Sequence, residues 1–240
     1  MGAVPSWALV RHIRRPPDVE ASEDFEATTH GGPATFHGRA RSILVQDVTI
    51  QDKQALRRML REKRREHVEA LPRAVSALVF SRPPSAVLAM VPDRATVGLY
   101  SASGAEAPSL AYAKWFHENG HALALPRFAE RGGTMEFRRW HDPYDEGELE
   151  TGPFGLLQPT ASSELALPGL LFVPLVGFTA AGDRLGQGGG HYDRWLSAHR
   201  DVPAIGLAWD CQRVDALPRE AHDRAMAMVV TPTRIYEGGI

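Results

Sequence analysis

Short apolar segments alternate with helically patterned segments between residues 95 and 232. Apolar runs of strand length are ATVGLY (95–100), HALALP (121–126), LLFVPLVGF (170–178), PAIGLAW (203–209) and AMAMVVTP (225–232). The intervening segments include two that predict helices and one that alternates like a half-exposed strand, namely APSLAYAKWFHENG (107–120), HYDRWLSAHR (191–200) and MEFRRW (135–140). The pattern predicts an α/β fold with a mostly parallel or mixed sheet and helices on both faces.

The chain before this pattern divides near residue 48. Thr49 begins a capping-box pattern, and the following segment predicts a helix because it contains no glycine or proline up to Pro72. A second helix is expected around residues 74–80. Residues 1–48 lack sustained periodicity and are expected to form an N-terminal extension, poorly ordered or packed along the surface of a single domain over residues 49–240.

Bulk composition argues against several classes of function. Charged residues make up 23% of the chain and the formal net charge is −2, so the overall charge does not call for nucleic acid or a membrane surface. No apolar run approaches the ~20 residues of a membrane helix. The single cysteine, Cys211, excludes an internal disulfide and fits a reducing compartment. A soluble cytoplasmic protein with neither a nucleic-acid nor a membrane partner is therefore expected.

Positive charge is concentrated in one helix. Residues 53–73 contain eight Lys and Arg against three acidic residues, with only a thin apolar stripe. Most of this helix should therefore face water or a ligand. Nucleic-acid binding is an alternative, although interleaved aromatic residues and a groove-reading motif are missing.

A glycine-rich stretch, RLGQGGGHYDRWL (184–196), follows the most apolar strand candidate. Glycines allow several backbone N–H groups to surround one small anion, and the N-terminus of the helix that opens near His191 adds partial positive charge. Arg184 offers a bidentate contact to phosphate. The loop fits neither a P-loop nor a dinucleotide fingerprint. A mobile connection is the alternative, but Arg184 and Asp193 at the loop edges favour anion binding.

Five ordered segments resemble the 5-formyltetrahydrofolate cyclo-ligase family, also called 5,10-methenyltetrahydrofolate synthetases. They cover about residues 50–235 and are KQALRRMLREKRRE, VGLYSASGAEAPS, GHALALPRF, LLFVPLVGFTAAGDRLGQGGGHYDRWL and LPREAHDRAMAMVVTP. The resemblance implies a three-layer α/β/α fold. It also implies an enzyme that uses ATP and Mg²⁺ to convert a reduced folate, 5-formyltetrahydrofolate, into 5,10-methenyltetrahydrofolate, ADP and phosphate. In that reaction the formyl oxygen attacks the γ-phosphate, and N10 then displaces phosphate.

The resemblance also implies site residues. Arg184 is the implied catalytic residue, and Asp193 and Asp223 are the implied Mg²⁺-associated carboxylates, a pair that suits this hard ion. The implied ATP contacts are Lys53, Gln54, Ala55, Leu56, Arg57, Arg184, Leu185, Gly186, Gln187, Gly188, Gly189, Gly190, His191 and Tyr192. The implied folate contacts are Ser101, Glu106, Gln187, Gly188, Gly189, Gly190 and His191.

Simpler roles stay open for several of these residues. Either aspartate could be a helix cap or a salt-bridge partner, and Glu106 could cap the helix at 107–120. The His and Cys spacings do not resemble a zinc site. Met135 and Phe137 resemble apolar walls of the site, although strand residues of this kind are more often plain core. The expected solvated basic face consists of Arg58, Arg61, Lys63, Arg64 and Arg65.

The sequence departs from the family pattern at three positions. Thr179 replaces an aspartate, His191 replaces a tyrosine, and Gln187 replaces a tyrosine or arginine. These changes are expected to cluster at the folate side of the site. The alternatives to a folate cyclo-ligase are a relative that acts on another amide-bearing substrate and a non-catalytic folate- or nucleotide-binding protein.

Overall fold

The computed structural model describes residues 38–76, 78–220 and 223–239. The helices are α1 (Gly38–Ala70), α2 (Arg73–Ser76), α3 (Ser85–Leu88), α4 (Leu110–Glu118), α5 (His191–Ala198) and the 3₁₀ turn η1 (Asp210–Gln212). The strands are β1 (Val97–Gly98), β2 (Leu123–Phe128), β3 (Met135–Trp140), β4 (Leu149–Thr151), β5 (Leu157–Pro159), β6 (Leu170–Pro174), β7 (Gly177–Phe178), β8 (Arg184–Leu185), β9 (Ala204–Leu207), β10 (Met228–Val230) and β11 (Ile235–Glu237).

A seven-stranded mixed sheet forms the centre of the fold, in the order β11-β10-β9-β6-β1-β2-β3. The five inner strands run parallel to one another, whereas the edge strands β3 and β11 pair antiparallel to β2 and β10. Two small sheets, β4-β5 and β7-β8, lie outside the main one. The predicted parallel or mixed sheet is confirmed.

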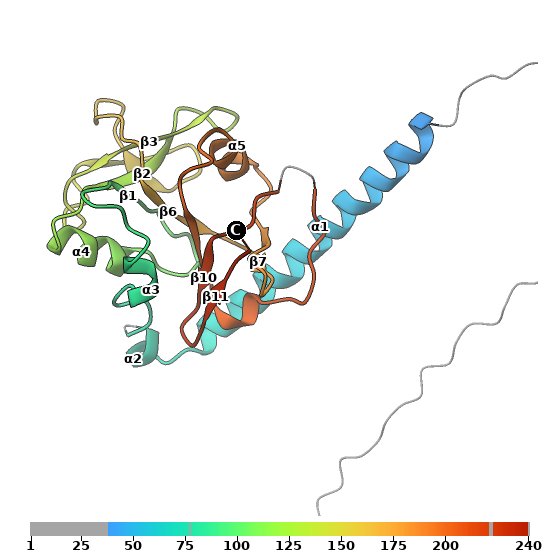
Figure 1. Ribbon diagram of the computed structural model, residues 1–240, viewed down its shortest axis with the longest axis horizontal. Helices are drawn as coiled ribbons and strands as arrows, with labels where there is room; N and C mark the ends of the chain where they lie inside the picture. Colours follow the sequence, from blue (N-terminus) through green and yellow to red (C-terminus); the bar gives the residue numbers. More distant parts are fainter. Residues whose placement is uncertain (1–37, 77, 221–222, 240) are drawn as a thin grey trace, which may run out of the picture.

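Helices cover both faces of this sheet. Along β6, Leu170 and Phe172 belong to one buried cluster, and Leu171 and Val173 belong to another, because successive strand side chains point to opposite faces. The first cluster packs under α3 and α4, and the second packs under α5. This three-layer arrangement confirms the predicted fold class (Figure 1).

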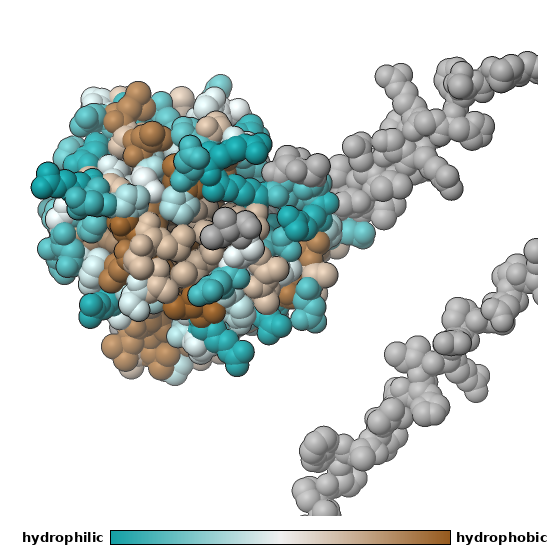
Figure 2. Space-filling model, viewed as in Figure 1, coloured by the Kyte–Doolittle hydropathy of each residue, from teal (hydrophilic) through white to brown (hydrophobic). Residues whose placement is uncertain are grey.

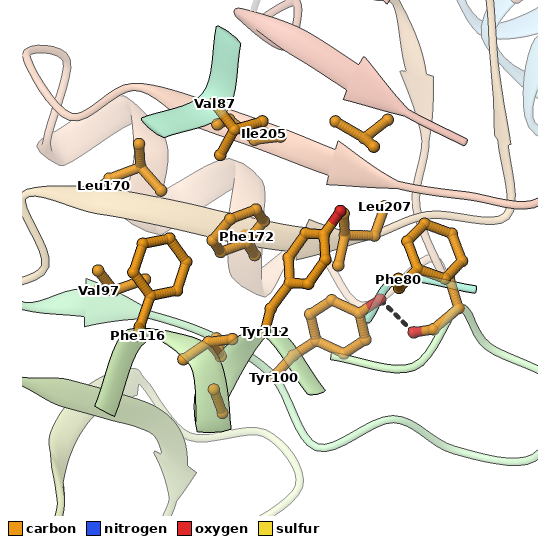
Figure 3. Close-up of a cluster of buried hydrophobic side chains, with 14 of the residues drawn as sticks. Phe80, Val87, Val97, Tyr100, Tyr112, Phe116, Leu170, Phe172, Ile205 and Leu207 are labelled. Carbon is orange, nitrogen blue, oxygen red and sulfur yellow. Dashed lines mark hydrogen bonds between the residues drawn. The ribbon is translucent and has the colours of Figure 1, made fainter. Parts of the chain in front are cut away.

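The cluster beside α4 combines aromatic rings with aliphatic side chains (Figure 3). Phe172 lies with its ring centroid 5.5 Å from that of Tyr112 and 5.9 Å from that of Phe116. Tyr100 is also buried, and its hydroxyl donates a hydrogen bond to the carbonyl oxygen of Ala107. The one polar atom of that side chain is thus satisfied inside an apolar core.

The long helix α1 contacts the sheet only through its later turns. Leu60 forms a small buried cluster with Val176 and Leu185, while the N-terminal part of α1 extends away from the sheet (Figure 1). The prediction that this helix begins at Thr49 is wrong, because it begins at Gly38. No glycine or proline interrupts the sequence between residues 39 and 71, so nothing local stops the helix at residue 49.

Two other sequence predictions need correction. The expected helix around 74–80 is only the four-residue α2, and Phe80 has a φ of 55°, which is incompatible with a continuing right-handed helix. The expected strand over 170–178 divides into β6 and β7, because the Leu175 and Val176 carbonyls accept side-chain hydrogen bonds from Gln212 at the break.

Residues 1–37 lie outside the described residues, so the proposed extension over residues 1–48 stays a prediction for that part. Within the described ranges, no helix combines the length and apolarity needed to cross a membrane. On the face drawn in Figure 2, hydrophilic residues surround several separate apolar patches. The exposed side chains of Val75 and Leu78 belong to the region around α2.

We expect Phe172→Ala to lower the free energy of unfolding by about 3–5 kcal/mol, because the substitution leaves a cavity in a fully buried aromatic cluster. Urea unfolding followed by circular dichroism measures this loss. Leu167→Ala is the control, since Leu167 is 65% exposed and its truncation should change the free energy by less than about 0.5 kcal/mol. Equal midpoints for the two variants would contradict the packing described.

Candidate active site

A cavity of about 880 Å³ lies at the carboxyl ends of three neighbouring parallel strands. Its wall includes Tyr100 after β1, Phe128 at the end of β2 and Pro174 at the end of β6. The later turns of α1, the glycine loop and the β4-β5 hairpin complete it. Positions beyond the carboxyl ends of strands are typical ligand sites in open α/β sheets.

The glycine loop connects β8 to α5. Arg184 and Leu185 form β8, so the loop itself begins at Gly186, later than the sequence predicted. Gly188 has a φ of 105° and Gly190, which directly precedes α5, has a φ of 65°. Side chains other than glycine rarely adopt these angles, which explains why the turn into α5 needs glycine.

Two arginines of α1 hold this loop. Arg57 Nε donates to the Gly186 carbonyl at 2.9 Å, and Arg61 donates to both the backbone oxygen and the side-chain oxygen of Gln187, at 2.9 and 2.8 Å. Charge-assisted bonds of this kind are stronger than neutral ones. The shape of the glycine loop therefore depends on the face that α1 presents to it.

The predicted ATP contacts on α1 lie beside an acidic cluster. Lys53 is 8% exposed, and its Nζ lies 2.8 Å from Glu220 Oε1 and 3.3 Å from Asp223 Oδ2. Burial and the neighbouring Arg61 lower the pKa of Arg57, while Asp193, Glu220 and Asp223 act in the opposite direction. Among the described residues, the cavity wall does not include Lys53, Gln54, Ala55, Leu56 or Arg57. These five contacts stay a prediction.

Arg184 and Asp193, both in the cavity wall, form an ion pair. The Arg184 side chain is 5% exposed, and its Nε is buried without a hydrogen-bond partner. The implied catalytic arginine and one implied metal ligand thus neutralise each other, as Lys53 and Asp223 do. Among the described residues, no group of three or more His, Cys, Asp or Glu could hold a metal ion.

A Mg²⁺ ion still fits this donor set if nucleotide oxygens complete its coordination. Mg²⁺ is commonly bound through one or two carboxylates together with phosphate oxygens and water, rather than by an all-protein cage. Asp193 and Asp223 are carboxylates of that kind. Asp223 pairs with Lys53 and Asp193 pairs with Arg184, and both of these basic side chains could bind phosphate instead.

Glu106 joins the other side of the cavity to the glycine loop. The residue is 8% exposed, and its carboxylate accepts a hydrogen bond from Ser103 N at 2.8 Å and from Gln187 Nε2 at 2.6 Å. Glu106 is not the cap of the following helix, because α4 begins at Leu110 with Ser109 before it. Ser101, also in the wall, donates its hydroxyl to the Leu157 carbonyl.

His191 belongs to an aromatic group in the cavity wall. Its ring centroid lies 4.8 Å from that of Phe128 and 5.7 Å from that of Phe154, in edge-to-face arrangements. Arg194 Nη2 lies 3.0 Å from His191 Nδ1. Burial, and then the positive charge of Arg194, lower the pKa of His191 below its ordinary value.

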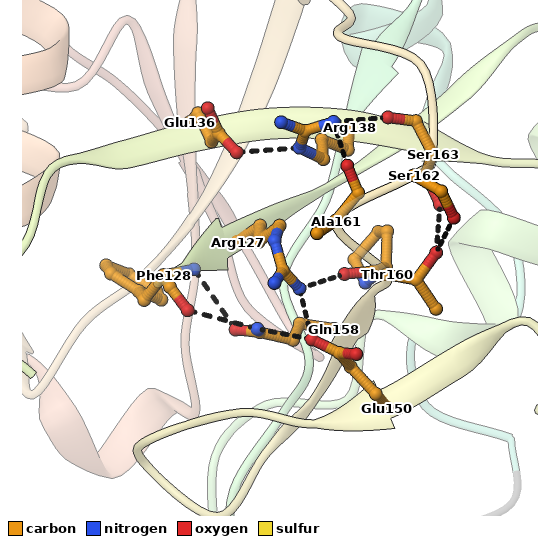
Figure 4. Close-up of polar contacts among 11 residues, drawn as sticks. Arg127, Phe128, Glu136, Arg138, Glu150, Gln158, Thr160, Ala161, Ser162 and Ser163 are labelled. Carbon is orange, nitrogen blue, oxygen red and sulfur yellow. Dashed lines mark hydrogen bonds and ion pairs between the residues drawn. The ribbon is translucent and has the colours of Figure 1, made fainter. Parts of the chain in front are cut away.

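The β4-β5 hairpin that carries Phe154 is anchored by one amide side chain (Figure 4). Gln158 accepts a hydrogen bond from Phe128 N and donates one to Phe128 O, both at 3.1 Å. Arg127 adds an ion pair with Glu150. A Cβ atom on Gly152 would lie 2.3 Å from Gln158 Oε1, so a larger residue there would displace the Gln158 amide. The anchor fixes the hairpin against β2.

Several other sequence-based interpretations are settled by these positions. Arg64 is only 6% exposed, so the solvated-face interpretation is wrong for it, whereas Lys63 is exposed. Met135 and Phe137 are core residues under α5 and do not line the cavity, so the core alternative is confirmed and the role as site walls is wrong. Thr179 lies in the β7-β8 turn, where its hydroxyl donates to Asp183 Oδ2, away from the cavity wall.

Sequence reasoning missed several residues of the cavity wall, among them Arg61, Arg64, Phe128, Phe154 and Gln158. The spacing of Arg57, Arg61 and Arg64 was a usable signal, because it places these arginines on the same helical face as the buried Leu60. Nothing in the local sequence brings Phe128 and Phe154 together.

We expect Gln158→Leu to speed backbone hydrogen exchange across residues 149–159, because the substitution breaks both bonds to Phe128 and leaves backbone groups unpaired. Mass-spectrometric hydrogen exchange measures the change. Gln54→Leu is the control, since Gln54 is exposed on α1. Unchanged exchange in the hairpin would show that Gln158 does not anchor it.

We expect His191 to titrate below its ordinary pKa of 6.5, and Phe154→Ala to raise that pKa toward 6.5 by exposing the ring. Between the folded pKa and 6.5, this histidine binds a proton in the unfolded chain but stays neutral in the folded protein. His191 therefore lowers the free energy of unfolding as the pH falls below 6.5 toward its folded pKa. Nuclear magnetic resonance of the ring protons follows the titration. A wild-type pKa above 6.5 would contradict the burial described.

Comparison with known proteins places these features in one family. The model of the 5-formyltetrahydrofolate cyclo-ligase family matches residues 49–232. The chain is 36% identical over 111 residues to the 5-formyltetrahydrofolate cyclo-ligase of Escherichia coli K12, a match that covers 44% of this chain and 59% of the relative. It is 31% identical over 144 residues to that of Mycolicibacterium smegmatis, covering 58% and 74%.

Solved structures agree with the sequence comparison. The 5,10-methenyltetrahydrofolate synthetase of Aquifex aeolicus superposes with a TM-score of 0.61 at 27% identity, covering 77% of this chain and 92% of that one. The synthetase from Mycoplasma pneumoniae superposes with a TM-score of 0.53 at 22% identity, over 74% and 97%, and supports the fold alone. With the family model matched over most of its length, the chain belongs to the 5-formyltetrahydrofolate cyclo-ligase family.

Proposed function

We propose that the protein is an enzyme that converts 5-formyltetrahydrofolate into 5,10-methenyltetrahydrofolate with ATP and Mg²⁺, releasing ADP and phosphate. The observation that carries this proposal is the composition of the single cavity at the strand ends. One side presents arginines and the glycine loop, and the other presents a buried carboxylate and three aromatic rings. Such a cavity suits two ligands of different chemistry that must meet.

The aromatic side suits the reduced pterin of the folate. Phe128, Phe154 and His191 offer ring faces and edges to a flat heterocycle. Glu106 is acceptor-only when ionised, and a carboxylate retains lone pairs beyond the bonds it takes from Ser103 and Gln187. Those lone pairs match the N–H donors of a pterin ring.

The basic side suits the ATP phosphates. In this proposal Lys53, Arg57 and Arg184 exchange their carboxylate partners for phosphate oxygens, while the loop from Gly186 to Tyr192 surrounds them. That exchange releases Asp193 and Asp223 to hold Mg²⁺ together with the nucleotide. When bound, the ion supplies positive charge that offsets the charge of the phosphates.

The protein's own task is to position and to stabilise charge. The formyl oxygen is a poor leaving group, so ATP first phosphorylates it, and N10 of the folate then closes the ring as phosphate leaves. Both steps gain from holding the reacting atoms in line and from fixed positive groups around the phosphoryl oxygens. The ion-paired Arg184, in the cavity wall, is a fixed positive group suited to the second role.

A second candidate is a family relative that acts on another amide-bearing substrate. The specific observation that favours it is the Gln187–Glu106 hydrogen bond, which occupies part of the carboxylate expected to bind the pterin. Gln187 and His191, two of the three departures from the family pattern, both lie in the cavity wall. Thr179 does not, so the three departures do not form one cluster.

We expect the purified protein to form methenyltetrahydrofolate from 5-formyltetrahydrofolate only when ATP and Mg²⁺ are both present, because the formyl oxygen must be activated. Ultraviolet absorbance of the product follows the reaction. Glu106→Gln should raise the KM for the folate about tenfold or more while leaving the Kd for ADP unchanged, since it removes the charge that favours pterin N–H donors.

The matched control is Glu130→Gln, which makes the same change at an exposed position. Wild-type protein that binds ADP and yields no product would contradict the cyclo-ligase proposal. If Glu106→Gln behaves like Glu130→Gln, the pterin does not contact Glu106.

A further inference from the structure

Arg64 is a buried cation in the cavity wall whose hydrogen bonds are incomplete. The residue is 6% exposed, and its Nη1 donates to the Leu175 carbonyl at a long 3.4 Å. Its Nε is buried and has no partner. Among the described residues, no ion pair within 4.0 Å involves Arg64.

An arrangement of this kind is costly in a protein without a ligand. Burying a charged group without a hydrogen-bonded partner of opposite charge destabilises the folded state, and a buried unpaired donor adds to that cost. Burial accordingly lowers the pKa of Arg64, and the nearby Glu106 carboxylate is the largest influence in the other direction. A group with these properties in a cavity wall is expected to receive its missing acceptor from a bound molecule.

The position of Arg64 on α1 indicates which parts of the two proposed ligands it would contact. Arg57 bonds the glycine loop at Gly186, where the phosphates are proposed to bind. Arg64 comes seven residues later, about 10 Å further along the helix axis at 1.5 Å per residue. Glu106, at the pterin end, is the charge that most raises its pKa. Arg64 therefore lies toward the junction between the two proposed ligands.

We propose that Arg64 is a catalytic residue whose guanidinium binds the formyl oxygen of the folate and the phosphoryl group that this oxygen receives. The inference rests on the proposed function and adds a residue to it. In the first step the formyl oxygen forms a bond to the γ-phosphorus, and the bond from that phosphorus to the ADP oxygen breaks, with its electron pair going to ADP.

In the second step N10 bonds to the formyl carbon, the carbon–oxygen bond breaks, and phosphate leaves with the electron pair. The N10 proton goes to solvent. Negative charge spreads over the oxygens beside the guanidinium in both steps, so a fixed buried cation stabilises the transition states more than the bound reactants.

The test compares wild type with Arg64→Met, Arg64→Lys and Lys63→Met. Lys63→Met is the matched control, because Lys63 is an exposed cation beside Arg64 and outside the cavity wall. In Arg64→Met we expect kcat to fall about 100-fold, with the Kd for ADP, measured by calorimetry, within twofold of wild type. Arg64→Lys should recover part of that loss, and Lys63→Met should match wild type.

Thermal unfolding without ligands separates this role from a structural one. Arg64→Met should unfold at or above the wild-type temperature, because it removes an incompletely paired buried charge, whereas the loss of a structural contact would lower the midpoint. Arg64→Met with near-normal kcat, or with activity and midpoint falling together, would overturn the inference. Product formation by wild type tests the proposed function separately, in the same assay.

Discussion

The hydrogen bonds from α1 to the glycine loop are the interaction on which the rest of the site depends. Arg57 and Arg61 reach across from the helix to the carbonyls of Gly186 and Gln187. The loop follows a two-stranded hairpin outside the main sheet, so the sheet alone does not fix it. A run of glycines restricts the backbone little by itself, so these contacts help to fix its shape. The position of α1 thus decides where an anion could bind.

The site is organised around ion pairs that neutralise its own binding groups. Lys53 faces Glu220 and Asp223, and Arg184 faces Asp193. Such pairing limits the cost of holding several buried cations close together before a ligand arrives. Arg64 is the exception, since it is buried and no ion pair among the described residues includes it. Lys53 and Arg184 therefore have carboxylate partners within the protein, whereas Arg64 depends on the proposed ligand for one.

The fold could be predicted from local patterns, and the site only in part. Apolar runs of strand length marked β2, β6, β9 and β10, because burial on both faces leaves a strong local signal. The strands β4 and β5 were missed, since they are three residues long and carry polar positions. The burial of Arg64 was missed for another reason. A helical pattern shows which residues share a face, but not which carbonyls or cavities that face will meet.

Gln187 performs two opposite tasks, since its amide oxygen accepts from Arg61 and its amide nitrogen donates to Glu106. An arginine at position 187 could donate hydrogen bonds but could not accept one. A tyrosine would place its hydroxyl at a different distance from the backbone. Residues 61, 106 and 187 therefore form one hydrogen-bonded unit. A substitution at position 187 that is harmless in a relative would be damaging here unless position 61 changed with it, so mutational effects at these positions should be strongly non-additive.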